Sequence, residues 1–372
     1  MKIYRPSSFA TGAVLALVFL TSAVQAQTVK VGVQLPLTGE RADVGKLMQN
    51  ALQMALDKVN AGAKGPKLEL VWSDDASTAD GSVKALDKLV HDPQVIAIAG
   101  EINSPLVLAS APIVDKEAVP YLTGGSSPRT TAASKWIFRA GASDTVLAGF
   151  IAQFIVDDLK AKDVAILHDK TGVHNQRAGF VADTLKEKGI VASVNATWSP
   201  GDKDFAAQIG QVKASNAKVL VALGETAEGG AFLKQVKSSG LQVQVIGHRD
   251  FGVKPVLDEA GAAAEGTLIF TEYAPALMSP ATQTWAADYK KRFGADANVI
   301  AAQYYDSLLM IAEAIKAGGS TRAGVKTGLE GLKAFKGIMA DYTFDANHNG
   351  VHRFFVAKVS GGKLTLAKTV TE

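Results

Sequence analysis

Two short segments rich in glycine and serine carry the residue types that bind an anion. The segment Gly100–Pro105 follows the apolar run Val95–Ala99, and Thr123–Pro128 follows the apolar run Val119–Leu122. Ser104 suits the start of a helix, where free backbone N–H groups and a hydroxyl together can hold a negative charge. Ordinary helix capping and a tight turn would use the same residues, so neither segment alone decides between the two interpretations.

Both segments follow apolar runs that are typical of strands, and this shared position favours anion binding over ordinary capping. In open α/β sheets, ligands bind at the carboxyl ends of parallel strands, where both segments would lie. Glycines at positions 124 and 125 let a ligand approach the backbone closely, with the hydroxyl of Ser127 beside it. We therefore predict a carboxylate-binding site that includes Ser104, Gly125 and Ser127.

No motif in the sequence assembles a nucleophile, a base and an orienting group, so we predict that the protein is not an enzyme. Asp345–Gly350 begins like a calcium loop, but the twelfth position of that loop is Val356 instead of a bidentate glutamate, which favours a turn between strands. His168–Lys170 ends an apolar run without a second histidine at ligand spacing, which favours a loop that lines a cleft. We expect no metal and no cofactor.

The composition limits the class of protein. The 372 residues are 47% hydrophobic and 20% charged, as in globular chains, and their number favours two lobes. The formal net charge of +3, from 39 Lys and Arg against 36 Asp and Glu, is too balanced for a nucleic-acid partner. The absence of cysteine excludes disulfides, zinc–thiolate sites, iron–sulfur clusters and cysteine nucleophiles.

Residues 1–26 have the pattern of a cleavable signal peptide. Lys2 and Arg5 form a positive start, the apolar run Ala13–Leu20 follows, and Val24–Ala26 supplies a cleavage site. The apolar run is too short, and too interrupted by Thr and Ser, for a membrane anchor. We expect the mature chain to begin at Gln27 and to be exported to a bacterial periplasm.

The mature sequence alternates short apolar runs with amphipathic ones. This alternation predicts βαβ units and two parallel sheets, because near-continuous runs of Val, Ile and Leu are typical of strands that are covered on both faces. The predicted strands are Val29–Leu35, Leu68–Trp72, Val95–Ala99, Val164–Leu167, Val219–Leu223, Val243–Ile246 and Thr267–Phe270. The predicted helices are Gly45–Asn60, Ser82–His91, Ser104–Glu117, Thr145–Leu159, Arg177–Lys188, Phe205–Ala214 and Ala227–Ser238.

After Tyr273 the order of elements changes. Two long helices, Ala281–Phe293 and Ile300–Ala317, come in succession and return the chain to the first lobe, and short strands follow between residues 338 and 368. No repeat or low-complexity linker separates the two halves of the sequence. We therefore expect several crossovers between the lobes instead of a single tether.

The order and spacing of short motifs resemble those of the periplasmic branched-chain amino-acid-binding proteins, the solute receptors of ABC transporters. The resemblance covers essentially the whole mature chain. Its motifs are Pro36–Gly39 with Gly45, Ser73–Ala76, Gly100–Ser104, Ser127–Pro128, Phe138–Arg139, His168–Lys170, Gly201–Phe205, Glu228 with Lys234–Gln235, Ala264–Gly266 and Tyr305–Asp306.

The resemblance implies the type I periplasmic binding fold, in which two doubly wound parallel-sheet α/β lobes are joined by three crossovers. The crossovers would lie near residues 145, 273 and 346. Lobe 1 would then comprise residues 27–145 and 274–345, and lobe 2 would comprise residues 146–273 and 346–372. The ligand would lie between the lobes, which would close on it about a hinge.

The resemblance also implies that Ser104 and Ser127 hold the α-carboxylate of the ligand, while an acid and an aromatic of lobe 2 hold its ammonium. This sequence departs from that pattern, because the acidic position is Arg249 and the tyrosine position is Glu225. We predict that Glu225 and Arg249 both face the cleft, Glu225 for an ammonium and Arg249 for a second carboxylate or another planar anion. An internal ion pair of Arg249 with Asp250 or Glu225 stays open as the alternative.

Further departures concern the walls of the cleft. Two aromatic positions of the family are Val44 and Val173 here, which enlarges the space for a ligand. Glu101 and Asp250 are further candidate ligand contacts. The resemblance therefore implies an amino acid or a related small carboxylate as ligand, without the simple leucine specificity of many relatives.

The leading functional hypothesis is a monomeric periplasmic solute-binding protein whose partners are a small-molecule ligand and a cognate ABC permease. The alternative is a periplasmic sensor of small organic acids, including aromatic and dicarboxylic acids. The sequence leaves open both the choice between transport and sensing and the choice between an amino acid and a non-amino organic acid.

Overall fold

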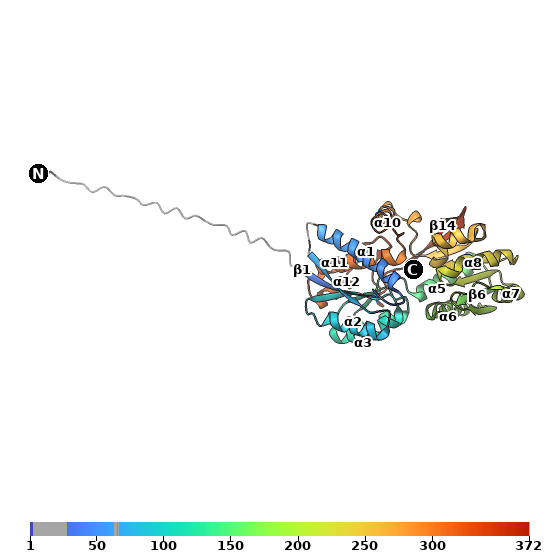
Figure 1. Ribbon diagram of the computed structural model, residues 1–372, viewed down its shortest axis with the longest axis horizontal. Helices are drawn as coiled ribbons and strands as arrows, with labels where there is room; N and C mark the ends of the chain where they lie inside the picture. The colour runs from blue at the N-terminus through green and yellow to red at the C-terminus, as the bar shows by residue number, and fades with distance from the viewer. Residues whose placement is uncertain (3–27, 63–64, 66, 372) are drawn as a thin grey trace.

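The computed structural model describes residues 1–2, 28–62, 65 and 67–371, so residues 3–26 of the predicted signal peptide lie outside the described ranges. The chain forms two lobes that lie side by side (Figure 1), each built on its own sheet. Among the described helices, none combines the length and the apolar character that a membrane span requires. The predicted fold class, two α/β lobes, is confirmed.

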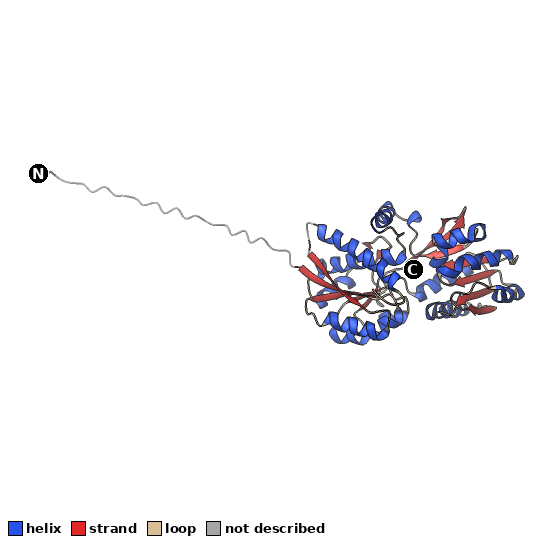
Figure 2. Cartoon of the chain, in the orientation of Figure 1, coloured by secondary structure: helices blue, strands red, loops and turns tan. Residues whose placement is uncertain are grey.

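The sheet of lobe 1 has the strand order β2-β1-β3-β4-β5, and all its neighbouring strands are parallel. These strands are β1 (Thr28–Leu35), β2 (Lys67–Asp74), β3 (Val95–Ala99), β4 (Tyr121–Thr123) and β5 (Ile137–Arg139). The helices of this lobe are α1 (Ala42–Ala61), α2 (Ala79–Val90), α3 (Ser104–Glu117), α4 (Pro128–Ala132), α10 (Pro280–Phe293), α11 (Val299–Gly318) and α12 (Arg322–Glu330). Helices α1 and α11 pack together on one face of the sheet, and α2 and α3 cover the other (Figure 2).

The sheet of lobe 2 has the order β14-β13-β10-β9-β8-β6-β7. Its strands are β6 (Val164–Asp169), β7 (Val194–Trp198), β8 (Val219–Leu223), β9 (Gln244–His248), β10 (Leu268–Thr271), β13 (Arg353–Ser360) and β14 (Lys363–Thr371). Its helices are α5 (Asp144–Asp157), α6 (Gly172–Glu187), α7 (Ala206–Ser215), α8 (Thr226–Ser238) and α9 (Lys254–Ala260), with short 3₁₀ turns η1 (Arg249–Gly252), η2 (Gly261–Ala264) and η3 (Pro275–Leu277). Strands β6 to β10 are mutually parallel, whereas β13 and β14 add to the sheet in antiparallel fashion.

Both parallel cores share one topology. The orders β2-β1-β3-β4-β5 and β7-β6-β8-β9-β10 place the second strand on one side of the first and the later strands on the other. The direction of winding therefore reverses between β1 and β3 in lobe 1 and between β6 and β8 in lobe 2. In doubly wound sheets the loops at the carboxyl ends of such strands enclose a crevice that binds ligands.

The chain crosses between the lobes three times, after β5, after β10 and between β12 (Asp341–Tyr342) and β13. The first and third crossings are joined by backbone hydrogen bonds. Arg139 N–H donates to the carbonyl of His348 at 2.9 Å, and Gly350 N–H donates to the carbonyl of Arg139 at 3.0 Å. These bonds pair the first and third crossings, and we call the paired residues, Arg139 and 348–350, the hinge segment. A small ribbon of β11 (Phe335–Lys336) and β12 lies next to α11 in lobe 1.

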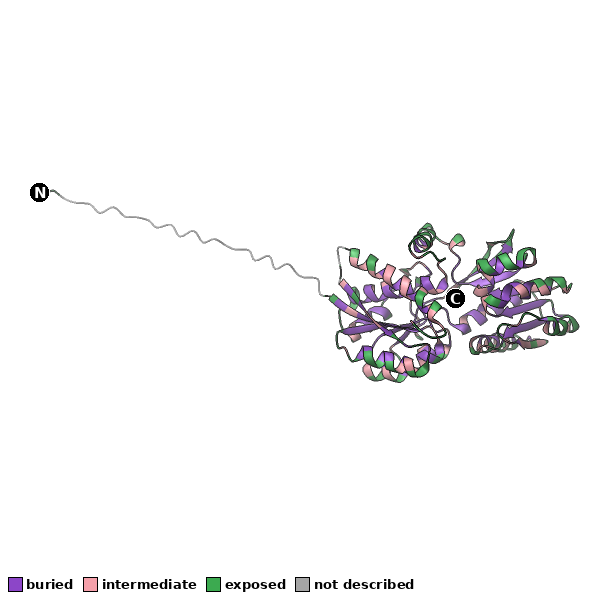
Figure 3. Ribbon diagram, in the orientation of Figure 1, coloured by how far each residue is buried: buried purple, intermediate pink, exposed green. Residues whose placement is uncertain are grey.

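Burial follows the layers, with the central strands buried and the outer helix faces exposed (Figure 3). Every residue of β3 is buried, which agrees with its continuous apolar sequence. The sequence does not predict β7, because this edge strand is half-exposed and lacks a continuous apolar run. It does not predict α12 either. This helix contains glycines because it packs closely on α11: a Cβ atom at Gly328 would lie 2.3 Å from the carbonyl oxygen of Ala314.

Candidate functional site

A cleft of about 700 Å³ lies between the lobes at the carboxyl ends of both parallel cores. Lobe 1 lines it after β1, β3 and β4 with Arg41, Val44, Ser104, Ser127 and Arg129. Lobe 2 lines it after β6 and β8 with Thr171, Val173, Gln176 and Glu225. Among the described residues the lining holds no aromatic side chain, and it mixes charged and hydroxyl groups with apolar side chains such as Leu108.

Two serines form an incomplete polar pair on the lobe 1 side of the cleft. Ser104 Oγ accepts a hydrogen bond from the backbone N–H of Ser127 at 3.1 Å. Ser127 Oγ is buried and has no hydrogen-bond partner among the described residues. Since an unsatisfied buried polar group costs about 1–3 kcal/mol, this hydroxyl is arranged for a partner that the protein itself does not supply. The N-cap of α3 is Asn103, not Ser104 as the sequence indicates, so the Ser104 hydroxyl is free to face the neighbouring turn.

Gly125 lies in the turn between β4 and α4, and its backbone N–H group is not available to a ligand. That N–H group donates to Thr123 Oγ1 at 2.9 Å. A Cβ atom at position 125 would lie 3.1 Å from Ser104 Oγ, so a larger residue would press on the first serine, and glycine accommodates the close approach. The expectation that the backbone N–H of Gly125 assists the carboxylate is therefore wrong.

The side chain of Arg139 donates hydrogen bonds to the same turn. Its Nε donates to the carbonyl of Gly125 at 2.7 Å, and its Nη2 donates to the carbonyl of Ser127. Its Nη1 donates to the side chain of Asn349 on the third crossing. Burial lowers the pKa of Arg139 to about 10, so the guanidinium is still charged at neutral pH. The serine pair is therefore fixed to the hinge segment.

Glu225 faces the cleft from lobe 2, at the N-cap position of α8. Burial raises the pKa of this carboxyl group; His174 opposes the shift, whereas the carboxylates of Asp250 and Asp169 add to it. A ligand ammonium would favour the ionised form of Glu225. Val173, in the first turn of α6, also lines the cleft.

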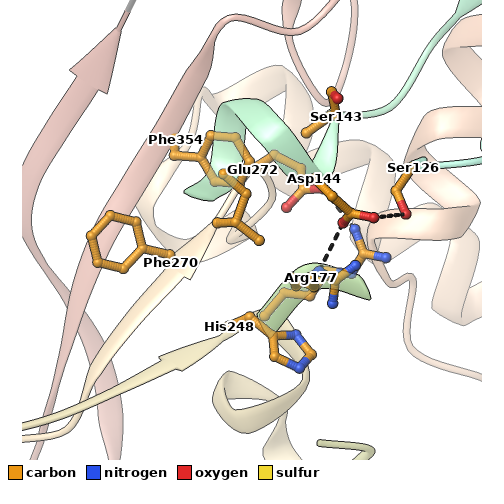
Figure 4. A pocket seen from close by; sticks show the side chains of 11 residues that line it. Ser126, Ser143, Asp144, Arg177, His248, Phe270, Glu272 and Phe354 are labelled. Carbon is orange, nitrogen blue, oxygen red and sulfur yellow. Dashed lines mark hydrogen bonds and ion pairs between the residues drawn. The ribbon is translucent and has the colours of Figure 1, made fainter. Parts of the chain in front are cut away.

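A second cavity, of about 10 Å³, adjoins the cleft at the hinge and is large enough for about one water molecule (Figure 4). Asp144 lines both spaces. It accepts hydrogen bonds from Ser126 Oγ at 2.9 Å and from Arg177 Nε at 2.8 Å. This chain of contacts links the turn after β4 in lobe 1 to α6 in lobe 2.

Arg249 lines the small cavity and not the cleft, so the prediction that it faces the cleft is wrong. Its Nη1 donates to Glu272 Oε1 at 2.7 Å, so its partner is neither Asp250 nor Glu225. Burial opposes the charge of Arg249, but Glu272 and then Asp250 outweigh that effect and raise the pKa. Asp250 is also absent from the lining of the cleft, because it turns toward His248, with Oδ2 3.3 Å from Nδ1.

Glu101 lies beneath the cleft instead of at its edge, which corrects the expectation of a ligand contact. The residue is fully buried and its Oε1 accepts the N–H of Asn103 at 2.7 Å. Burial raises the pKa of Glu101 well above its usual range, and the neighbouring carboxyl group of Asp75 raises it further. Glu101 Oε2 and Asp75 Oδ2 are both buried and have no hydrogen-bond partner among the described residues.

Arg41 and Arg129 are lining residues that the sequence analysis missed. Neither guanidinium forms an ion pair or a side-chain hydrogen bond with another described residue. Arg41 occupies the N-cap position of α1, after β1, and Arg129 lies in the first turn of α4, after β4. A search for charged residues after every predicted strand would have found both.

Two α/β lobes with a cleft between their strand ends have the architecture of a bilobal solute-binding protein. Residues 28–363 match the family model described as periplasmic binding protein, and the chain belongs to that family. The leucine-, isoleucine-, valine-, threonine- and alanine-binding protein of Pseudomonas aeruginosa is 30% identical over 254 residues, which are 67% of this chain and 68% of that protein. A Leu/Ile/Val-binding protein homolog of Brucella abortus is 28% identical over 326 residues, 86% of each chain.

Solved structures share the fold over nearly the whole chain. The branched-chain amino acid transporter substrate-binding protein of Streptococcus pneumoniae, in complex with isoleucine, has a TM-score of 0.78 and 23% identity, covering 93% of this chain and 100% of its own. A solute-binding protein of Rhodopseudomonas palustris in complex with benzoate has a TM-score of 0.77 and 17% identity, covering 92% and 96% of the two chains. At these identities the similarity establishes the architecture.

Proposed function

We propose that this chain is a periplasmic solute-binding protein that binds an amino acid between its lobes and delivers it to an ABC permease. It is not an enzyme and acts as a monomer. The lobes that close on the ligand are residues 27–145 with 274–345 and residues 146–273 with 346–372, and residues 1–26 direct export and are removed. The relatives that are named for branched-chain amino acids support this proposal.

The observation that carries the proposal is the unpartnered hydroxyl of Ser127. This buried group lines the cleft beside Ser104, while Glu225 lines it from the other lobe. Two hydroxyl groups suit a carboxylate and an acidic group suits an ammonium, so the two sides match the two ends of an α-amino acid. A ligand that touches both lobes favours the closed state by its higher affinity for that state.

The side chain of the amino acid is polar or anionic in this proposal. The cleft has no aromatic wall, and Arg41 and Arg129 add two cationic groups without ion-pair partners among the described residues. Guanidinium groups bind carboxylates through paired donors. Although Glu40 and Asp43 also line the cleft, Arg41 and Arg129 give a polar or anionic side chain two candidate partners that a leucine side chain cannot use.

The proposal is tested by a thermal-shift screen of amino acids, dicarboxylates and aromatic acids, followed by calorimetry on the best ligand. Because a hydrogen bond to a charged group contributes about 1.5–3 kcal/mol, Ser127→Ala should weaken binding by about tenfold or more. The matched control is Ser134→Ala, a buried serine of the same lobe that donates to Asp115 at 2.9 Å and lies outside the cleft lining.

Equal affinity of Ser127→Ala and the unmodified protein would contradict the proposed site. Binding of an aromatic acid without an ammonium, in preference to every amino acid, would assign the cleft to organic acids instead.

A further inference from the structure

Two histidines and three carboxylates meet in lobe 2 between the cleft and the small cavity, and we call them the histidine cluster. Its members are Asp169, His174, Glu225, His248 and Asp250. The ligand atoms of His174, His248 and Asp250 lie within 4.8 Å of one another, as do those of Asp169, His174 and Glu225. The histidines are 2% and 1% exposed, and their ring centroids are 4.9 Å apart. The sequence gives no sign of this cluster, because β9 and α6 are far apart along the chain.

Hydrogen bonds fix which nitrogen of each ring is available. His174 Nδ1 lies 2.7 Å from Asp169 Oδ2, so this nitrogen donates to the carboxylate and Nε2 is the nitrogen that can bind a metal ion when the ring is neutral. His248 Nε2 lies 3.1 Å from the carbonyl oxygen of Gly224, which can only accept, so Nδ1 keeps its lone pair. Metal-binding histidines are held in this way, with the second ring nitrogen donating to a carboxylate or a backbone carbonyl.

The available nitrogen of His248 faces another acceptor. Asp250 Oδ2 lies 3.3 Å from His248 Nδ1, and the only donor to this nitrogen among the described residues is the backbone N–H of Asp250, at 3.4 Å. Two facing acceptors repel each other unless a cation lies between or beside them. The arrangement therefore points to a cation that is bound by both groups.

The charges around the histidine cluster are compatible with a bound divalent cation. The neighbouring arginines are engaged elsewhere, because Arg177 pairs with Asp144 and Arg249 pairs with Glu272. The three carboxylates of the histidine cluster have no ion pair with an arginine or a lysine among the described residues. A divalent ion would balance much of this negative charge.

We propose that His174 Nε2, His248 Nδ1 and the Asp250 carboxylate bind a divalent transition-metal ion of the Zn²⁺ class. Imidazole ligands favour such ions, whereas Mg²⁺ and Ca²⁺ prefer oxygen ligands alone. Ligand atoms around a tetrahedral Zn²⁺ are about 3.4 Å apart, which the 3.3 Å between Asp250 Oδ2 and His248 Nδ1 already matches, and any longer distance to His174, within the 4.8 Å limit, would shorten on binding. Three protein ligands leave a fourth position for water, and Asp169 and the Gly224 carbonyl orient the two rings.

The proposal is tested on the untagged mature chain after removal of metal with a chelator. Zn²⁺ is titrated in competition with a chromophoric chelator, and Co²⁺ is used to obtain a visible spectrum of the site, with no carboxylate ligand present. We expect one ion per chain, a raised melting temperature and the strong visible bands of a four- or five-coordinate Co²⁺ site. Since no amino acid is added, a failure here is separate from a failure of the proposed solute site.

Variants locate the ion. Asp250→Asn, at a partly exposed side chain, and His248→Ala should each weaken Zn²⁺ binding by more than about tenfold, and Asp169→Asn by about 10- to 100-fold through the orientation of His174. The matched control is His91→Ala, an exposed histidine of lobe 1, which should bind Zn²⁺ like the unmodified protein. The proposal is overturned if no stoichiometric binding occurs, or if Asp250→Asn, shown by its melting temperature to be folded, binds as tightly as the control.

Discussion

At the residue scale, the cleft combines charges of both signs. Lobe 1 lines it with Arg41 and Arg129 and also with Glu40 and Asp43, and lobe 2 lines it with Glu225. The arginines have no ion-pair partner among the described residues, so they contribute little to the stability of the ligand-free protein. Their positions suit an anionic group at the far end of the ligand.

We therefore expect Arg41→Ala and Arg129→Ala to weaken the binding of acidic amino acids by about tenfold or more, since each removes charge-assisted hydrogen bonds. Neither should change the melting temperature of the ligand-free protein by more than about a degree. Arg292→Ala is the control, because Arg292 pairs with Asp57 outside the cleft. Calorimetry with acidic and neutral amino acids checks the prediction, and an unchanged preference in both cleft variants would refute it.

The carboxyl pair of Glu101 and Asp75 gives the protein a specific pH dependence. Burial raises the pKa of both groups, so the folded state holds a proton that the unfolded state releases. The stabilisation is complete below the ordinary pKa of glutamate, about 4.3, and is lost as the pH rises toward the raised pKa of Glu101.

Glu101→Gln should therefore flatten the fall in melting temperature as the pH rises above the ordinary pKa of glutamate, about 4.3, because the amide can donate to Asp75 without a titrating proton. Calorimetric scans across that range test this. Glu313→Gln, at an exposed position, should keep the slope of the unmodified protein, and a parallel slope for Glu101→Gln would show that the pair does not share a proton.

At the element scale, the turn between β4 and α4 sets the distance between the two serines. Its glycine accommodates Ser104 Oγ, and Arg139 binds two of its carbonyl groups. Gly125→Ala should weaken ligand binding by about tenfold, because the added Cβ displaces one hydroxyl from the pair. Gly179→Ala on α6, where a Cβ meets no atom within 4 Å, should leave binding unchanged. Titrations of both variants decide whether the turn is part of the site.

The sequence correctly predicts elements such as β3 and β8. Strands that are buried on both faces consist of a continuous run of apolar residues, and this signal can be seen in the local sequence. The edge strand β7 and the glycine-containing α12 lack that signal. The positions of Ser104 and Ser127 could be predicted because both residues follow strand ends. The neighbours of Glu101 and Arg249 could not be predicted in this way. Asp75 and Glu272 lie more than 20 residues away along the chain, so only the folded topology brings these partners together.

At the scale of the whole molecule, three crossings and a buried polar network connect the lobes. The Arg249–Glu272 pair lies at this hinge, and Glu272 is 4% exposed. Removal of one partner from a buried ion pair leaves the other charge uncompensated.

Arg249→Ala should lower the free energy of unfolding by up to about 3 kcal/mol and leave the ranking of ligands unchanged. Urea unfolding of the ligand-free protein gives the first quantity and calorimetry gives the second. A stable variant with a changed ranking would restore Arg249 to the ligand site.

In the proposed complex, the carboxylate of an amino acid binds to the two serines of lobe 1, and Glu225 binds the ammonium from lobe 2. A crystal structure of the protein with the ligand that raises its melting temperature most tests this directly. We expect closed lobes, carboxylate oxygens within about 3 Å of Ser104 Oγ and Ser127 Oγ, and the ammonium within hydrogen-bond distance of Glu225. A ligand bound with its carboxylate toward lobe 2, or with Ser127 Oγ still unpartnered, would contradict it.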